Sequence, residues 1–181
     1  MLTLHEIGEQ TRNAVQLLVD RFDLGLTVGI LNDSDYRLLS SGMFGDLNWD
    51  WGVSQFTGRE NTFELCLKIA VEIDSYPAGV ALCAYRVDIG LFEIYMIENF
   101  VKDDQGHPLY KRMALFTFIA AYIFTDAVQG NEVAILEPAK DLVDYYTTFG
   151  FATDPTCSYR MVCRLDSLMP LLTDVEKLMQ R

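Results

Sequence analysis

The chain has 181 residues, of which 50% are apolar and 12% aromatic, and its formal net charge is −12 from 14 Lys+Arg and 26 Asp+Glu. This length fits one domain, and the apolar content is enough for a hydrophobic core, which excludes a disordered chain. The acidic balance argues against nucleic acid and anionic membranes as partners, because both select for a surplus of Lys and Arg. Residues 1–181 are therefore interpreted as a single, acidic domain.

The cysteines and histidines predict no metal or redox site. The four cysteines lie in apolar stretches without a CxxC spacing, which favours buried free thiols. The two histidines, His5 and His107, are far apart in the sequence. The N-terminus lacks the pattern of a secretory signal, and the longest apolar stretch, 113–124, is shorter than the ~18–20 residues of a membrane span. These features predict a soluble, cytoplasmic protein with four reduced thiols: Cys66, Cys83, Cys157 and Cys163.

The first half of the chain predicts a helix and a strand meander. A helix is expected over residues 3–22, where apolar residues recur at helical spacing and Thr3 with Glu6 forms a capping-box pattern. Residues 24–62 are rich in Gly, Asn, Asp and Ser and are expected to hold loops and short helices. Three strands joined by short turns then predict an antiparallel meander, over 63–74, 78–87 and 91–101. The first strand alternates with Leu65, Leu67, Ile69, Val71 and Ile73 on one side.

The second half changes to a helical period. Residues 109–128 predict a long helix with Pro108 in its first turn, apolar nearly all round and therefore buried on more than one face. Its large apolar side chains are expected to be core or a dimer face: Met113, Phe116, Phe118, Tyr122 and Phe124. The remaining expected elements are a strand over 132–136, a helix over 139–148 ended by Gly150, a partly strand-like stretch over 151–165 and a last helix over 166–180.

This order of elements predicts the fold class. A strand–helix–strand step in the second half implies a parallel strand pair with a right-handed connection. The meander before it supplies antiparallel neighbours. The prediction is an α/β (α+β) fold, with a central, mixed and mostly antiparallel sheet and helices on both faces.

Three segments of the sequence carry a family resemblance. They are IDSYPAGVALCAY, then LFEIYMIENFV with the long helix, and, as the most specific, EVAILEPAKDLVDYYTTFGF, which ends in Tyr-x-x-x-Gly-Phe from Tyr146 to Phe151. Over roughly residues 63–165 they resemble the GCN5-related N-acetyltransferase (GNAT) superfamily: in order, its second and third strands, its fourth strand and third helix, and its fifth strand and fourth helix. The resemblance implies direct acyl transfer from acetyl-CoA, or another acyl-CoA, to an amine in a ternary complex.

The resemblance also implies a cofactor site. The fourth and fifth strands would splay apart and expose backbone groups to the pantetheine chain, while the start of the long helix would face the pyrophosphate. The family pattern at that helix is Gln/Arg-x-x-Gly-x-Gly/Ala, but here Tyr110 and Arg112 stand where glycines are usual. Bulky side chains at these positions could block the approach of phosphate to the backbone. Alternatively, the side chains of Lys111 and Arg112 could hold the phosphate themselves. The expected cofactor residues are Ile97, Asn99, His107, Tyr110, Lys111, Arg112 and Met113.

Transfer to an amine needs a base for the amine and an acid for the leaving thiolate. By the resemblance, Tyr146 matches the tyrosine that often acts as the acid, and the alternative is that it only packs its helix against the sheet. Glu93 lies where some members of the family carry a glutamate base. Glu98, five residues on, shares its face only if a β-bulge intervenes, as is usual in that strand of the family. The alternative for both glutamates is a solvated or structurally paired acid.

The acceptor region of the family corresponds here to a stretch with three acids and two tryptophans. An acidic, aromatic pocket would suit a cationic amine, and the alternative is ordinary loop acids with anchoring tryptophans. These residues are Asp33, Asp35, Asp50, Trp49 and Trp51. The expected partner is an amine-bearing small molecule or protein, with a homodimer as a further option and with no nucleic acid, membrane or metal.

Two rival functions stay open. The missing glycines at Tyr110 and Arg112 favour a GNAT-like binding or regulatory protein without catalysis. The charge of −12 allows an interaction protein of phage or plasmid type whose acidic surface mimics nucleic acid.

Overall fold

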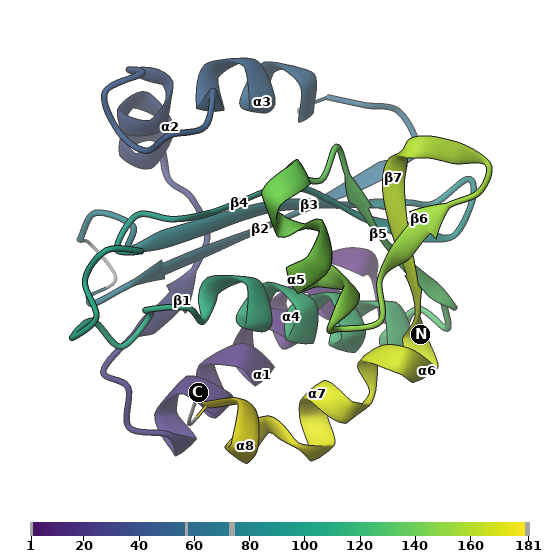
Figure 1. Ribbon diagram of the computed structural model, residues 1–181. Helices are drawn as coiled ribbons and strands as arrows, with labels where there is room; N and C mark the ends of the chain where they lie inside the picture. Colours follow the sequence, from purple (N-terminus) through teal and green to yellow (C-terminus); the bar gives the residue numbers. More distant parts are fainter. Residues whose placement is uncertain (1, 57, 73–74, 180–181) are drawn as a thin grey trace.

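The computed structural model describes residues 2–56, 58–72 and 75–179 (Figure 1). Its centre is a seven-stranded sheet in the order β1-β2-β3-β4-β5-β7-β6, in which β4 and β5 are parallel and the other described pairs antiparallel. The strands are β1 (Thr27–Gly29), β2 (Thr62–Ala70), β3 (Gly79–Arg86), β4 (Leu91–Asn99), β5 (Glu132–Leu136), β6 (Ala152–Asp154) and β7 (Cys157–Arg164). The predicted mixed, mostly antiparallel sheet with one parallel pair is confirmed.

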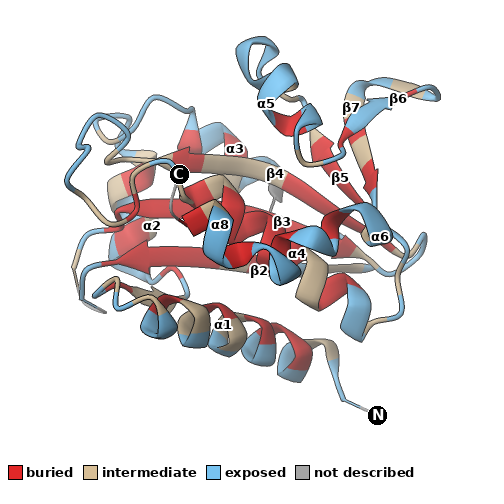
Figure 2. Ribbon diagram, turned by 60° about the horizontal axis from the view of Figure 1, so that its bottom comes forward, coloured by how far each residue is buried: buried red, intermediate tan, exposed pale blue. Residues whose placement is uncertain are grey.

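Helices cover both faces of the sheet, as predicted. α1 (Leu4–Arg21) and α4 (Met113–Ala127) pack together on one face, and α2 (Asp33–Ser40) and α3 (Trp49–Phe56) lie on the other (Figure 1). The larger hydrophobic core lies on the α1 and α4 side, and a smaller core lies under α2 and α3. Buried residues line the sheet and the inner side of α1, whose outer side is exposed (Figure 2).

The remaining helices are short. A 3-10 turn η1 (Lys140–Leu142) leads into α5 (Val143–Thr147), which lies beside the parallel strand pair (Figure 1). The chain ends in α6 (Leu165–Leu168), α7 (Pro170–Thr173) and α8 (Val175–Met179), of which α6 and α7 pack on α4. The stretch predicted as one helix over 139–148 is thus η1 followed by α5, which ends at Thr147. Gly150, the predicted stop, follows with a φ of 95°, which favours glycine.

α1 begins as its sequence predicts. The Thr3 hydroxyl accepts the N–H of Glu6 at 3.2 Å, and the Glu6 carboxylate accepts the N–H of Thr3 at 2.7 Å. This reciprocal pair is a capping box, which satisfies two backbone donors at the start of the helix.

α4 begins four residues later than predicted. Lys111 has a φ of 59°, in the left-handed region that an α-helix does not contain, so the helix starts only after it. Pro108 therefore lies in the preceding turns rather than in the first helical turn. The prediction that the helix is buried on more than one face is confirmed, and Met113, Phe116, Phe118 and Phe124 belong to the core.

Two predictions about strands are wrong: β1 was not expected, and β2 ends earlier than predicted. β1 was expected to be loop, because a three-residue strand carries no measurable alternation. The strand predicted over 63–74 ends at Ala70, and Val71 is 52% exposed rather than buried with its alternating neighbours; residues 73–74 lie outside the described residues.

The predicted last helix over 166–180 is three short helices. Pro170 stands at the start of α7, where it has no N–H to continue the hydrogen bonds of α6. Asp174 then separates α7 from α8 with a non-helical φ of −106° and ψ of 15°. Residue 180 lies outside the described residues.

A β-bulge in β4 sets which side chains share a face. Leu82 of β3 pairs with Met96, but the next residue, Cys83, pairs with Ile94, so Tyr95 is the extra residue. Glu93 therefore lies opposite Ala84 and Glu98 opposite Val80, and Ala84 and Val80 both face the smaller core. The bulge places both glutamates on the α2 and α3 face of the sheet, as the sequence allowed.

None of the four cysteines forms a disulfide in the structure. Cys83 and Cys163 are buried, Cys66 and Cys157 half-buried, and burial raises the pKa of Cys66 and of Cys163 to about 11. Within the described part of the chain, no group of three His, Cys, Asp or Glu side chains could hold a metal ion. Nor does that part contain a helix long and apolar enough to cross a membrane.

Candidate functional site

β4 and β5 pair only near their starts and then separate. The parallel register runs from Phe92 opposite Val133 to Ile94 opposite Ile135, yet β4 continues to Asn99. A cavity of about 690 Å³ lies at this divergence, bounded by the end of β4, the start of α4, α5 and the loop before α3. We call it the splay cleft. Among its lining residues are Ile97, Glu98, Asn99, Lys111, Met113 and Tyr146.

The end of β4 offers backbone groups to the splay cleft. The N–H of Phe100 donates to the carbonyl of Ala78 at 2.9 Å, which directs the backbone of Phe100 toward the segment leading into β3. Backbone groups alternate in direction along a strand, so those of Ile97 and Asn99 point the other way, toward the cleft. The side chain of Asn99 is already bonded, because its Nδ2 donates to the carbonyl of Leu109 at 3.0 Å. Asn99 therefore presents its backbone rather than its amide.

The start of α4 supplies unbonded donors at the same cavity. In the part of the chain that the structure describes, the N–H groups of Met113, Ala114 and Leu115 donate to no acceptor. Such amides, with the positive end of the helix dipole, make a helix start a site for anions. Lys111 adds an exposed ammonium at the lining of the cleft.

The bulky residues before α4 are used locally. The Arg112 guanidinium donates to the carbonyls of Pro108 at 2.7 Å and Met179 at 2.8 Å, which ties α8 to the start of α4. His107 accepts the N–H of Leu109 on Nδ1 at 3.1 Å. Neither His107 nor Tyr110 lines the splay cleft, and the Tyr110 ring instead lies 5.1 Å from the Lys111 ammonium.

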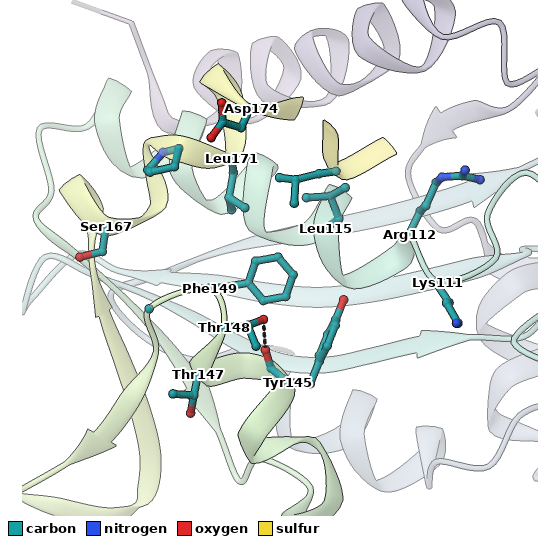
Figure 3. Close-up of a pocket in the computed structure, with 13 residues that line it drawn as sticks. Lys111, Arg112, Leu115, Tyr145, Thr147, Thr148, Phe149, Ser167, Leu171 and Asp174 are labelled. Atoms are coloured by element: carbon teal, nitrogen blue, oxygen red, sulfur yellow. Dashed lines mark hydrogen bonds between the residues drawn. The ribbon is translucent and has the colours of Figure 1, made fainter. Parts of the chain in front are cut away.

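A second cavity, of about 710 Å³, adjoins the splay cleft. Both cavities are lined by Lys111 and Tyr145. Its far wall is formed by α6, α7 and α8, with Ser167, Leu171 and Asp174 facing the space (Figure 3). This wall was not predicted, because the three short helices were expected to be one helix.

Tyr146 packs its helix against the core and also lines the splay cleft. Its ring packs edge-on against Phe118 at a centroid distance of 6.0 Å, and the residue lines the splay cleft while only 7% exposed. Burial, helped by the neighbouring Tyr145 and Asp141, raises the pKa of Tyr146 to about 12. The hydroxyl therefore keeps its proton at neutral pH and can donate it.

Glu98 holds the loop before α3 against the sheet. It is 8% exposed and accepts the indole N–H of Trp49 at 2.5 Å, the N–H of Leu47 at 3.4 Å and the N–H of Asp46. Gly45 allows this approach, because a Cβ there would lie 2.6 Å from a carboxylate oxygen of Glu98. Three donors therefore occupy the carboxylate.

Glu93 belongs to a short relay on the α3 side of the sheet. It is 4% exposed and accepts the hydroxyl of Tyr95 at 2.8 Å. That hydroxyl in turn accepts from Nη1 of Arg59 at 2.7 Å, while the guanidinium lies 5.1 Å from the centre of the Tyr95 ring. Burial and the hydrogen bond to Glu93 raise the pKa of Tyr95 to about 12. A cavity of about 240 Å³, which we call the α3 cavity, adjoins Tyr95, Arg59 and Trp51.

The chain resembles known proteins in its structure but not in its sequence. Neither a protein-family model nor a curated protein sequence matches the chain. Solved structures do match it: AtaTR bound with AcCoA gives a TM-score of 0.57 at 13% identity, covering 81% of this chain and 98% of the other. The fold is that of the GNAT superfamily.

Two further GNAT structures agree with this assignment. The spermidine/spermine N-acetyltransferase SpeG from Vibrio cholerae gives a TM-score of 0.51 at 13% identity, covering 80% of this chain and 96% of the other. Tetrahymena GCN5 gives 0.51 at 8% identity, covering 77% and 95%. The predicted resemblance to the GNAT superfamily is confirmed at the level of the fold.

Within this GNAT fold, the acceptor residues expected from the sequence do not form one pocket. Trp51 is 54% exposed and lines the α3 cavity, whereas Trp49 is buried against Glu98. Asp35 is buried in an ion pair with Lys68, so it lies in neither cavity. Asp33 and Asp50 are exposed and line neither cavity.

Sequence reasoning missed two residues of the candidate site, Tyr95 and Arg59. Tyr95 reaches Glu93 only because the bulge turns it to the same face, and the bulge was the available signal. Arg59 is 36 positions away from Tyr95 and comes from an irregular segment, so nothing local linked the two.

Proposed function

We propose that the protein is an acyl-CoA-dependent N-acyltransferase that transfers an acetyl group from acetyl-CoA to an amine in a ternary complex. One observation carries this proposal: a single cavity joins the exposed backbone of β4, the unbonded start of α4 and the protonated hydroxyl of Tyr146. These groups suit the amide chain, the phosphates and the sulfur of acetyl-CoA respectively.

Donor binding would use backbone more than side chains. The pantetheine amides would pair with the backbone of Ile97 and Asn99 in the manner of an added strand. The pyrophosphate would meet the first N–H groups of α4 and the ammonium of Lys111. Arg112 would act as a positioning residue, because its guanidinium is bonded to two backbone carbonyls.

The proposed acid and base of the reaction lie on different sides of β4: Tyr146 in the splay cleft, and Tyr95 with Glu93 on the α3 side. The amine nitrogen attacks the thioester carbonyl, a C–N bond forms, and the C–S bond breaks. The leaving thiolate takes the proton of Tyr146, whose high pKa keeps that proton in place until the sulfur becomes basic. Tyr95 takes the excess proton of the amine while passing its own to Glu93, along the hydrogen bond that joins them. Glu98 shapes the loop before α3 rather than acting as the base.

A thermal melt with acetyl-CoA tests the proposal. A ligand at 100 times its Kd stabilises the native state by about 2.7 kcal/mol, so the midpoint should rise with acetyl-CoA concentration. Lys111→Gln should weaken the rise, whereas Arg37→Gln, an exposed arginine of α2 outside both cavities, should leave it unchanged. No rise at millimolar acetyl-CoA would contradict the proposal.

The second candidate is a GNAT-fold binding protein without catalysis. The observation in its favour is that Tyr110 and Arg112 occupy positions where glycines are usual. A rise in melting midpoint without acetyl transfer to any amine, in an assay that follows free thiol, would favour this candidate.

A further inference from the structure

A fourth cavity, of about 500 Å³, lies at the β1 edge of the sheet. α1, β1 and β2 meet there, and β2 and β3 separate β1 from β4. Its polar lining includes Glu9 and Arg12 of α1, Ile30 and Asn32 after β1, and Lys68 of β2. None of these residues lines the splay cleft or the α3 cavity, so the proposed acyl transfer leaves this edge cavity unused.

Arg12 is the unsatisfied group of the edge cavity. Its side chain is half-buried, yet in the part of the chain that the structure describes its guanidinium donates no hydrogen bond and forms no ion pair. Loss of water lowers the pKa of Arg12, but the group stays charged at neutral pH. A partly desolvated cation without an acceptor is costly, and an anionic ligand would remove that cost.

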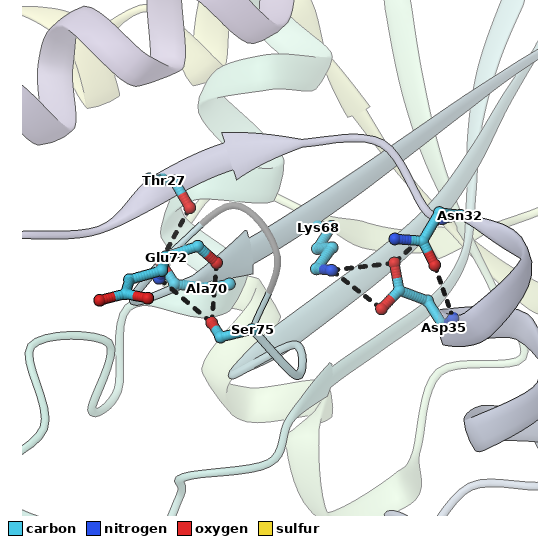
Figure 4. Close-up of polar contacts among 7 residues, drawn as sticks. All are labelled: Thr27, Asn32, Asp35, Lys68, Ala70, Glu72 and Ser75. Atoms are coloured by element: carbon cyan, nitrogen blue, oxygen red, sulfur yellow. Dashed lines mark hydrogen bonds and ion pairs between the residues drawn. The ribbon is translucent and has the colours of Figure 1, made fainter.

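A buried ion pair forms the inner wall of the edge cavity. Nζ of Lys68, which is 3% exposed, donates to both carboxylate oxygens of Asp35 at 2.8 and 2.9 Å (Figure 4). Asp35 also accepts the N–H of Asn32 at 2.9 Å. An ammonium has three protons, so the two bonds to Asp35 leave one for an occupant of the cavity.

Further donors stand beside Arg12. The Asn32 Oδ1 accepts the N–H of Asp35 at 2.9 Å, which fixes the side chain, and the NH₂ group of the amide donates to no acceptor in the described residues. The N–H of Ile30 likewise donates to no described acceptor. The edge cavity is thus rich in donors, with the Glu9 carboxylate as its charged acceptor.

The charges around the edge cavity indicate which charge its anion should carry. Asp35 neutralises Lys68, and Glu9, three residues before Arg12 on α1, offsets Arg12 electrostatically without forming an ion pair with it. The site therefore suits a single negative charge better than a double one. A guanidinium presents parallel N–H groups that match the two oxygens of a carboxylate.

We propose that the edge cavity binds a small carboxylate, held in two parallel hydrogen bonds by Arg12 and supported by the Asn32 amide and the Lys68 ammonium. This site is independent of the proposed acyl transfer.

Nuclear magnetic resonance of the Arg12 side chain tests the site directly. Sodium acetate is added to the full-length protein at constant ionic strength, with sodium chloride as the balancing salt, and the Nε–Hε signal of Arg12 is followed. We expect a saturable shift with acetate and a weaker affinity for inorganic phosphate. The absence of a saturable shift, or a higher affinity for phosphate than for acetate, would overturn the proposal.

Three variants make the test specific, each checked first for an unchanged backbone spectrum. Arg12→Lys keeps the charge but loses the paired N–H groups, so acetate affinity, read from Asn32, should fall roughly tenfold. Glu9→Gln removes the competing carboxylate and should tighten acetate binding. Arg37→Gln, whose arginine lies outside the edge cavity, should change nothing. If Arg12→Lys binds as tightly as the natural protein, or Glu9→Gln weakens binding, Arg12 is not the acetate ligand.

Discussion

At the scale of single residues, the site depends on what each polar group already bonds. Tyr146 has a packed ring and a hydroxyl that keeps its proton, whereas the carboxylate of Glu98 is filled by three donors. Glu93 shares its carboxylate with one hydroxyl, that of Tyr95. The same residue type on the same strand face therefore has two different bonding environments.

Tyr146→Phe should separate catalysis from packing. The phenylalanine ring keeps the contact with Phe118 but cannot protonate the thiolate, so kcat should fall about 10²-fold while the Kd of acetyl-CoA stays unchanged. Because burial raises the pKa of Tyr146 to about 12, kcat of the natural enzyme should hold as pH rises to about 10 and be lost only near the pKa. Steady-state kinetics and acetyl-CoA titrations measure both effects.

Tyr145→Phe is the matched control. Tyr145 is 37% exposed and adjoins the same cleft. It should keep kcat within a few-fold of the natural enzyme. An equal loss in the two variants would argue against a specific acid role for Tyr146.

Glu93→Gln and Glu98→Gln should have opposite signatures. Loss of the base in Glu93→Gln should lower kcat with little change in the free energy of unfolding. In Glu98→Gln an amide NH₂ replaces one acceptor oxygen and faces a donor, which should cost about 1–3 kcal/mol of stability. Urea unfolding and kinetics on both variants check this assignment, and a stable, inactive Glu98→Gln would instead make Glu98 the base.

At the scale of elements, the fold follows from local signals wherever they are long enough. The meander and the long helix have alternation or spacing that can be read in the sequence, whereas the bulge in β4 was suggested only by the family resemblance. β1 has only three residues, and Pro170 breaks the final helix, so these elements depend on tertiary contacts. The site divides in the same way: Tyr146 lies in a local motif, but the donors to Glu98 come from a loop about 50 positions away.

Arg112→Gln should loosen the attachment of α8 to the start of α4 more than it weakens the binding of acetyl-CoA. The guanidinium joins the start of α4 to the last carbonyl described in α8, so its loss should speed hydrogen exchange of the α8 amides and lower stability by about 1–3 kcal/mol. Acetyl-CoA affinity should fall less than in Lys111→Gln. A larger loss of affinity in Arg112→Gln than in Lys111→Gln would make Arg112 a phosphate ligand.

At the scale of the whole molecule, the net charge of −12 would oppose the acetyl-CoA of the proposed function, which is itself polyanionic. Long-range repulsion would then slow the encounter, and the favourable contacts would come from the local donors at α4 and Lys111. In a basic nucleotide-binding protein, by contrast, the net charge and the local binding groups both attract the anionic ligand.

Salt should therefore speed acetyl-CoA association. The Debye length is about 30 Å at 0.01 M ionic strength and about 8 Å at 0.15 M, so added salt screens the repulsion more than the close contacts. Stopped-flow mixing should show an association rate that rises over this range. A rate that falls with salt would mean that a local positive field at the splay cleft outweighs the net charge.

The early end of β5 has a consequence for the protein without its donor. Beyond Leu136, the last residues of β4 form an open strand edge in the middle of the sheet rather than at its border. Open edges invite pairing with other extended chains, and proteins normally shield them. An amide-bearing ligand in the splay cleft would act as that shield, so we expect the protein without its ligand to associate with itself through this edge more readily than the loaded protein.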